Sequence, residues 1–142
     1  MNIQTPVKNI MTETVISVGP KDNLKDVQKV FADNSFHHLP VVDKNGTVVG
    51  ILSRTDYQKV REVFSILKDV GVEMASINFA QTLLVDDIMK KSVVTIDANK
   101  TIEYAFAIFK MNFFHAMPVI DEDNKLVGIF STYDLLCAAY NQ

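Results

Sequence analysis

Two short segments of the chain carry side chains that could hold a phosphorylated ligand. Ser53 and Asp56 lie where an apolar run passes into a helical pattern, and Ser131 and Asp134 repeat that spacing. The first N–H groups of a helix have no intrahelical partner and attract anions, and a small hydroxyl adds a further donor. A carboxylate three residues after the serine can accept hydrogen bonds from both hydroxyls of a ribose. The spacing therefore indicates nucleotide binding, although the same residues are also those of an ordinary helix N-cap.

The two segments differ in the residues between serine and aspartate. Arg54 and Thr55 stand in the first segment, whereas Thr132 and Tyr133 stand in the second. Because phosphate charge needs a cation, the first segment suits a charged phosphate and the second suits an uncharged or weakly held group. Arg54 is equally consistent with a solvated surface arginine, and that alternative stays open.

The histidines give no sign of a metal site or a catalytic centre. His37 and His38 are adjacent, so in a strand they point to opposite faces. No cysteine or carboxylate has ligand spacing with them or with His115. The glycine-rich phosphate loops and the nucleophile elbow of common enzymes are absent from the sequence. We therefore expect a non-enzymatic protein without a catalytic cofactor or metal site, in which Mg²⁺ enters only together with a bound phosphate.

An internal repeat places both segments in the same structural context. Residues 37–43 (HHLPVVD) recur as 115–121 (HAMPVID), at an offset of 78 that also relates the two serine segments. Apolar periodicity and turn residues predict a β-α-β-β-α order in each repeat. The expected elements are a strand at 15–18, a helix from 24 capped by Asn23, strands at 39–42 and 48–52 joined by a turn, a helix at 53–67, a strand at 93–96, a helix at 101–111, strands at 117–120 and 126–130, and a helix from 131.

The repeats also define the expected domain organisation. We expect a first repeat at 1–60, a helical or irregular connector at 61–84 and a second repeat at 85–142. A unit of this size buries only a modest core alone, so the two repeats are expected to share one. The predicted fold class is α+β, with α/β-type units in one compact module.

Several apolar stretches have more than one interpretation. Met74, Ile77 and Phe79 in the connector could pack on the shared core or on a second copy of the chain. The helix at 101–111 is apolar on most sides, which favours a deep core position or, alternatively, a dimer interface. Cys137 has apolar neighbours at helical spacing, which predicts a buried thiol in a helix.

Composition narrows the classes of partner and compartment. A net charge of −3 and a pI of about 5.5 argue against a general nucleic-acid binder, which would present a basic face. No apolar run approaches the ~18 residues of a membrane span, and the first residues do not resemble a signal peptide. The one cysteine permits no internal disulfide and fits a reducing compartment, so a cytoplasmic location is expected.

The ordered set of motifs resembles a tandem pair of cystathionine-β-synthase (CBS) domains, an arrangement called a Bateman module. The resemblance rests on Ile10-Met11, on the strand 39–43 (LPVVD) and on the junction 49–56 (VGILSRTD), each of which recurs at the same offset. It implies two β-α-β-β-α units in a pseudo-two-fold arrangement, and association of two chains into a flat dimer. It further implies a sensor of AMP, ADP, ATP, S-adenosylmethionine or a dinucleotide that acts on a separate effector protein.

The resemblance also implies which residues line the ligand cleft between the repeats. The ribose and phosphate would be held by Ser53, Arg54, Thr55, Asp56, Ser131, Thr132 and Asp134. The base would lie in a slot lined by the first strand and the start of the second strand of each repeat. Those positions are Ile16, Ser17, Phe36, His37, His38, Leu39, Pro40, Val94, Thr95, Phe114, His115, Met117 and Pro118. The degenerate second junction supports the alternative of a structural dimerisation module that has lost its ligand.

Overall fold

The computed structural model describes residues 1–73, 78 and 82–140. The chain forms two compact units, and neither coincides with a sequence repeat. The first unit comprises Met1–Ile16, Asn45–Val48 and Val93–Gln142, and the second comprises Ser17–Lys44 and Val49–Ser92. Each unit therefore combines most of one repeat with the N-terminal segment of the other. The connector residues Met74, Ile77 and Phe79 lie outside the described residues.

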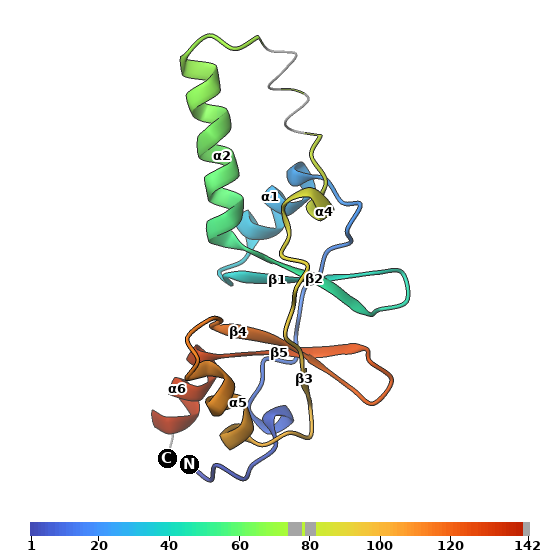
Figure 1. The fold of residues 1–142 in the computed structure, drawn as a ribbon, viewed down its shortest axis with the longest axis vertical. Coiled ribbons are helices and arrows are strands. Elements are labelled where there is room, and N and C mark those ends of the chain that lie inside the picture. The colour runs from blue at the N-terminus through green and yellow to red at the C-terminus, as the bar shows by residue number, and fades with distance from the viewer. Residues whose placement is uncertain (74–77, 79–81, 141–142) are drawn as a thin grey trace. The chain divides into compact units, whose positions relative to one another are not determined.

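The second unit is built around a two-stranded hairpin. Its elements are α1 (Leu24–Asp33), β1 (His38–Val42), β2 (Val48–Ser53), α2 (Arg54–Asp69) and α4 (Val85–Ile88). β1 and β2 form the sheet, and Val18 adds a parallel bridge to Val41. Both α1 and α2 lie on one side of the hairpin (Figure 1), so among the described residues of this unit no long helix covers the other side.

The first unit repeats this plan with a longer sheet. Its elements are the 3₁₀ helix η1 (Val7–Asn9), β3 (Ile96–Asp97), α5 (Ile102–Phe109), β4 (Ala116–Ile120), β5 (Leu126–Ser131) and α6 (Thr132–Tyr140). β3 pairs with β4 in parallel and β4 pairs with β5 antiparallel. In Figure 1, α5 and α6 again lie on one side of the sheet. The predicted mixture of helices and short strands is confirmed, and the parallel strands β3 and β4 are joined through α5.

The first strand of each repeat is shorter than predicted. Pairing begins at Val18 and at Ile96, which are equivalent in the two repeats, and not at positions 15 and 93. Val18 and Ile96 are buried, whereas Ile16 and Val94 are 39% and 37% exposed. Because β-branched residues favour strands mainly through packing, the exposed members of each run do not join the sheet.

Local capping and turn signals in the sequence are confirmed. The Asn23 side chain accepts a hydrogen bond from the Asp26 backbone N–H at 3.0 Å, and Asp26 accepts one from the Asn23 N–H at 3.4 Å. This reciprocal capping box begins α1. The hairpin turns use positive φ at Gly46 (80°) and at Asn124 (62°), which are residue types that tolerate it.

Two separate clusters of buried residues replace the single shared core that the sequence suggested. The cluster of the second unit contains Val18, Leu24, Val27, Phe31, Leu39, Val41, Leu52, Tyr57 and Val85. The cluster of the first unit contains Val7, Ile96, Ala98, Ala105, Phe109, Met117, Val119 and Phe130. Val85 and Val7 come from the other repeat in each case. The segments that each unit takes from the other repeat, which contain Val7 and Val85, therefore supply apolar surface that one repeat alone would lack. We call them the exchanged segments.

The apolar helix α5 is not buried on most sides, contrary to the first of its two interpretations. Ile102, Ala105 and Phe109 are buried, but Phe106 is 53% exposed and Tyr104 is 50% exposed. Cys137 on α6 is half-buried and not fully buried as predicted. The reason is the same for both helices: each touches the sheet along one stripe, and its opposite stripe stays apolar without a covering element among the described residues.

Candidate functional site

The exchanged segments are fixed against a glycine in the strand that precedes each junction. A Cβ on Gly50 would overlap the side chain of Met89 and lie 3.1 Å from the Lys90 carbonyl oxygen. A Cβ on Gly128 would overlap Met11 and lie 3.0 Å from the Thr12 carbonyl oxygen. These glycines therefore allow close packing of the Ile-Met segments against the strands.

Paired backbone hydrogen bonds then place residues 90 and 12 beside the junctions. Ile51 and Lys90 exchange N–H···O bonds of 3.0 and 2.9 Å, and Thr12 and Ile129 exchange two bonds of 3.0 Å. Lys90 and Thr12 are equivalent in the two repeats. The segment that each repeat donates thus contributes one polar side chain next to the serine and aspartate of the other.

The first junction combines a helix cap with a nearby cation. Ser53 caps α2, because its side chain accepts a hydrogen bond from the Asp56 N–H at 3.0 Å. The Lys90 Nζ lies 3.9 Å from Asp56 Oδ2, and the two side chains are 71% and 27% exposed. An ion pair of that length and exposure is weak, so both groups are available to a ligand at little cost.

The second junction is closed by its own hydrogen bonds. Asp134 Oδ2 accepts from the Ser131 N–H at 2.7 Å and from the Ser131 hydroxyl at 2.6 Å. Its other oxygen, Oδ1, accepts from the Thr12 hydroxyl at 3.0 Å. Asp134 is therefore occupied on both oxygens by neutral donors, whereas Asp56 faces an ammonium group. The two equivalent junctions therefore differ in their contacts, through Lys90 and Thr12 as well as through Arg54 and Thr132.

Arg54 points away from the N-terminal turn of its own helix. Its guanidinium donates hydrogen bonds to the backbone carbonyls of Phe31, Asn34 and Phe36, at 2.6 to 3.1 Å. The same group lies over the Phe31 ring, 4.8 Å from the centroid. The sequence allowed two roles for Arg54, a solvated surface side chain or a ligand of the phosphate. The observed contacts differ from both.

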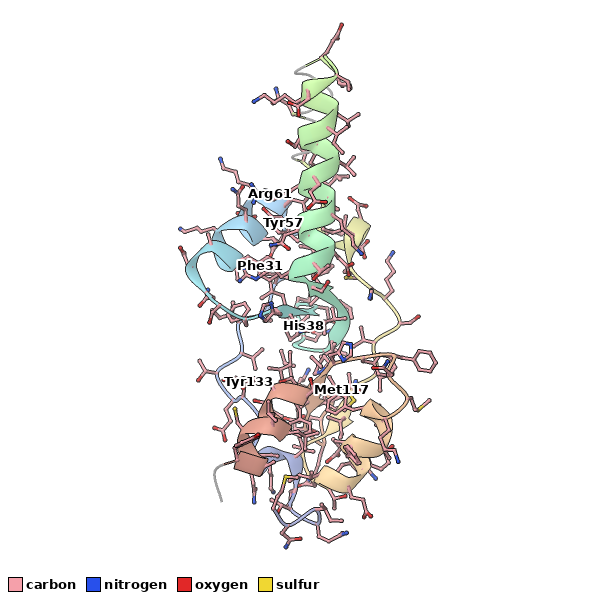
Figure 2. The ribbon with its side chains drawn as sticks, turned by 90° about the vertical axis from the view of Figure 1, so that its left-hand side faces the viewer. Phe31, His38, Tyr57, Arg61, Met117 and Tyr133 are labelled. Atoms are coloured by element: carbon pink, nitrogen blue, oxygen red, sulfur yellow. The ribbon has the colours of Figure 1, made fainter. Side chains whose placement is uncertain are left out.

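The base-slot residues of the second unit lie close to Ser53 along the backbone of β1. The Arg54 N–H donates to the His37 carbonyl at 2.7 Å, and the Val18 N–H donates to the Pro40 carbonyl at 3.1 Å. The side chain of Leu39 is fully buried in the core, and Phe36 packs against the same core. His37 is exposed, His38 is half-buried (Figure 2), and Ser17 is half-buried.

The first unit has the corresponding arrangement. The Thr132 N–H donates to the His115 carbonyl at 3.0 Å. Met117 is fully buried in the core (Figure 2), and Pro118 is also buried. The other slot residues are exposed or half-buried: Ile16, Val94, Thr95, Phe114 and His115. The expectation that a ligand lies between the repeats stays a prediction, because each unit is described by itself.

Sequence reasoning missed Lys90 and Thr12. Both follow an Ile-Met pair at the same offset of 78, so the repeat alone could have pointed to them. Among the described residues there is no group of three or more His, Cys, Asp or Glu side chains arranged to hold a metal ion. Within the same part of the chain, none of the helices has both the length and the apolar surface that crossing a membrane requires.

Comparison with known proteins places both junctions in one family pattern. A family model for the CBS domain matches residues 7–63 and again 85–141. The MJ1225 protein of Methanocaldococcus jannaschii is 29% identical over 130 residues, which is 92% of this chain and 45% of that protein. Its crystal structure matches 98% of this chain and 49% of that chain, with a TM-score of 0.80 and 27% identity.

Two further solved structures contain ligands. The CBS-pair protein CBSX2 of Arabidopsis thaliana was solved with AMP; it covers 96% of both chains with a TM-score of 0.74 and 24% identity. The CBS domain pair of protein MJ0100 was solved with 5-methylthioadenosine and S-adenosyl-L-methionine; it covers 96% of this chain and 97% of that chain, with a TM-score of 0.75 and 20% identity. At these identities the likeness shows the fold. This chain spans less than half the length of the curated relatives that it matches.

Proposed function

Because the chain belongs to the CBS-domain family, we propose that it is a non-enzymatic regulatory module that binds an adenosine-containing ligand through its two strand-to-helix junctions. The ligand class is that of AMP, ADP, ATP, S-adenosylmethionine or a dinucleotide, with Mg²⁺ only where a phosphate brings it. The module would act in the cytoplasm on a separate effector protein. A ligand can shift such a module between two states only if it binds one of them better than the other.

The duplicated Ser-x-x-Asp junction is the observation that carries this proposal. In each unit the serine stands at the start of a helix and an aspartate follows within its first turn. The positive end of the helix dipole at that point favours a phosphate, and the carboxylate suits ribose hydroxyls. The AMP and S-adenosylmethionine complexes of similar folds support the same ligand class.

The first junction is the stronger of the two sites in this proposal. Lys90 and Asp56 are held by one weak exposed ion pair, so Lys90 can turn to a phosphate while Asp56 accepts from a ribose. Asp134 already accepts hydrogen bonds from Thr12 and Ser131 on its two oxygens, so the hydroxyls of a ligand compete with these donors. A ligand at the second junction therefore gains less net free energy.

Calorimetric titration of ligand-free protein with AMP, ATP and S-adenosylmethionine tests the proposal. Asp56→Ala removes charged hydrogen bonds of about 1.5–3 kcal/mol, so AMP should bind about 10- to 100-fold more weakly. Asp134→Ala should cost less, and Asp69→Ala at the end of α2 is the exposed control that should leave affinity unchanged. Absence of binding by every adenosine compound with the unaltered protein would end the proposal.

A second function, association of two chains, is favoured by the exposed apolar side chains of α5 and α6 and the residues that follow α5. They are Tyr104, Phe106, Met111, Phe113, Tyr133, Leu136 and Tyr140. None of the residues of α6 is fully buried, and Tyr140 and Tyr133 are 83% and 71% exposed. Exposed apolar side chains in this number on two helices of one unit normally mark an interface. We propose that a second copy of the chain covers it in a homodimer.

Sedimentation velocity of matched charge variants tests this interface. Phe106→Glu places a charge in the patch and should shift the protein to monomer at micromolar concentration. Ile3→Glu, at a side chain that is 47% exposed in the same unit but outside α5 and α6, should leave the dimer intact. A dimer that forms normally while no adenosine compound binds would favour the purely structural function, and a monomeric unaltered protein would exclude the homodimer.

A further inference from the structure

We propose that Arg54 is a positioning residue, which fixes the Phe36–His37 segment of the first junction and does not hold the phosphate of a ligand. The inference rests on the proposed ligand binding and concerns how one wall of that site is kept in place. It replaces the simpler expectation that an arginine beside a phosphate-binding serine contacts the phosphate.

The Arg54 guanidinium satisfies several backbone carbonyls at once. Arg54 Nη2 donates to the carbonyls of Phe31 at 2.9 Å, Asn34 at 2.6 Å and Phe36 at 3.0 Å. Arg54 Nε also donates to the Phe36 carbonyl, at 3.1 Å. The planar fork of an arginine suits several fixed acceptors at once, and a lysine cannot reproduce it.

The carbonyls that Arg54 contacts lie in the last turn of α1 and just after it. α1 ends at Asp33, and Asn34 leaves the helix in an extended conformation with φ −137° and ψ 157°. The last carbonyls of a helix have no intrahelical partner and need donors from elsewhere. Arg54 supplies a donor for Phe31 in the last turn of α1 and also binds the carbonyls of Asn34 and Phe36 in the segment that follows, and its stacking on the Phe31 ring adds a contact with the core. The guanidinium therefore acts as a cap from a distant part of the chain.

Arg54 also links the end of α1 to the first junction. The backbone N–H of Arg54 donates to the His37 carbonyl at 2.7 Å, so the same residue holds the segment at both its side chain and its main chain. Ser53 directly precedes it and caps α2. The start of α2, where a phosphate is expected, and residues 36–37, where a base is expected, are thus joined through one residue.

In the other repeat, the carbonyls at the end of the corresponding helix find donors without an arginine. Thr132 stands at the equivalent position, and its N–H donates to His115, but its side chain is too short for a distant helix end. α5 instead ends in backbone turns: Lys110, Met111 and Asn112 donate to the carbonyls of Phe106, Ile108 and Phe109 at 2.9 to 3.1 Å, with Asn112 at φ 59°. The wall of the second junction is therefore not tied to its own helix start by a charged side chain.

Paired titrations with adenosine and AMP, which differ only in the phosphate, test the proposal. Arg54→Lys keeps the charge and loses the fork. It should weaken adenosine and AMP by the same factor, about 5- to 10-fold, so that the ratio of their affinities is unchanged. Lys90→Ala is the comparison variant, which should weaken AMP while adenosine is unaffected. A selective loss of AMP affinity in Arg54→Lys or Arg54→Gln would overturn the positioning role.

Hydrogen exchange of the ligand-free protein gives a readout that does not depend on binding. Arg54→Lys should speed exchange of peptides covering residues 34–38 at least tenfold, whereas Thr132→Ala should leave residues 112–116 unchanged. Unaltered exchange at 34–38 in Arg54→Lys would overturn the inference. If the unaltered protein binds neither compound but Arg54→Lys still speeds exchange, the proposed function fails and the positioning of this segment stands.

Discussion

Replacement of Gly50 by alanine should destabilise the second unit because it pushes out the segment donated by the other repeat. The added Cβ would overlap the Met89 sulfur and lie 3.1 Å from the backbone oxygen of Lys90. Overpacking of this kind costs about 1–3 kcal/mol, and the smaller conformational freedom of alanine in the unfolded chain returns about 0.4–1 kcal/mol. The expected net loss in the free energy of unfolding therefore lies between about 0 and 2.6 kcal/mol, with a central value of about 1.3 kcal/mol.

Urea denaturation followed by circular dichroism measures this loss, and Gly19→Ala is the matched control. At Gly19 the nearest atom to an added Cβ is an Asp22 carboxylate oxygen at 3.5 Å, which is ordinary contact, and its φ is not positive. Gly19→Ala should be neutral or stabilising. In a Met89→Ala background the Gly50→Ala cost should fall by at least 1 kcal/mol, since the obstructing side chain is gone. Equal stability of Gly50→Ala and Gly19→Ala would refute the packing argument.

Three further outcomes are expected. Asn23→Ala removes the capping box of α1 and should lower the free energy of unfolding by about 1 kcal/mol in urea denaturation, with Asn99→Ala outside any helix as the control. Burial raises the pKa of Tyr57 above 10.0, with a smaller opposing effect from Arg61. The folded state therefore holds this proton more tightly, and the associated stability is present below pH ~10 and lost as pH rises through the folded pKa, so Tyr57→Phe should make the alkaline fall in stability less steep between pH 9 and 11. Thr12→Val should free one oxygen of Asp134 and raise the affinity of the second junction for adenosine in calorimetry; an unchanged or lower affinity would contradict the account of that junction.

The element order was predictable because local signals and tertiary packing agree in this chain. The Asn23 cap, the turn that ends at Gly46 and the apolar spacing of Leu24, Val27 and Phe31 each act over a few residues, so they are legible in sequence. The first strands were predicted too long because Ile16 and Val94 have strand propensity without burial. Propensity alone does not reveal which members of a β-branched run will find a packing partner.

Only part of the candidate site could be predicted from the sequence, for a related reason. Ser53 and Asp56 stand together in sequence, so their juxtaposition needs no tertiary information. Lys90 reaches Asp56 only because its backbone pairs with Ile51, a contact between segments far apart in the chain. The direction of the Arg54 side chain likewise depends on where α1 ends, since the carbonyls that it caps are 18 to 23 residues away. Residue type alone suggests a phosphate ligand for any such arginine.

The exchange of Ile-Met segments bears on how a duplicated protein of this kind can arise and be divided. A fragment holding the second repeat alone would lack Val7 and Met11, which pack against the core that contains Phe130. Its sheet would expose the apolar surface that the missing segment covers. The fragment should bury that surface only by pairing with another molecule that offers the segment. A single-copy ancestor could then have been stable only as a reciprocal swapped pair, and gene fusion would have turned that exchange into one within a single chain.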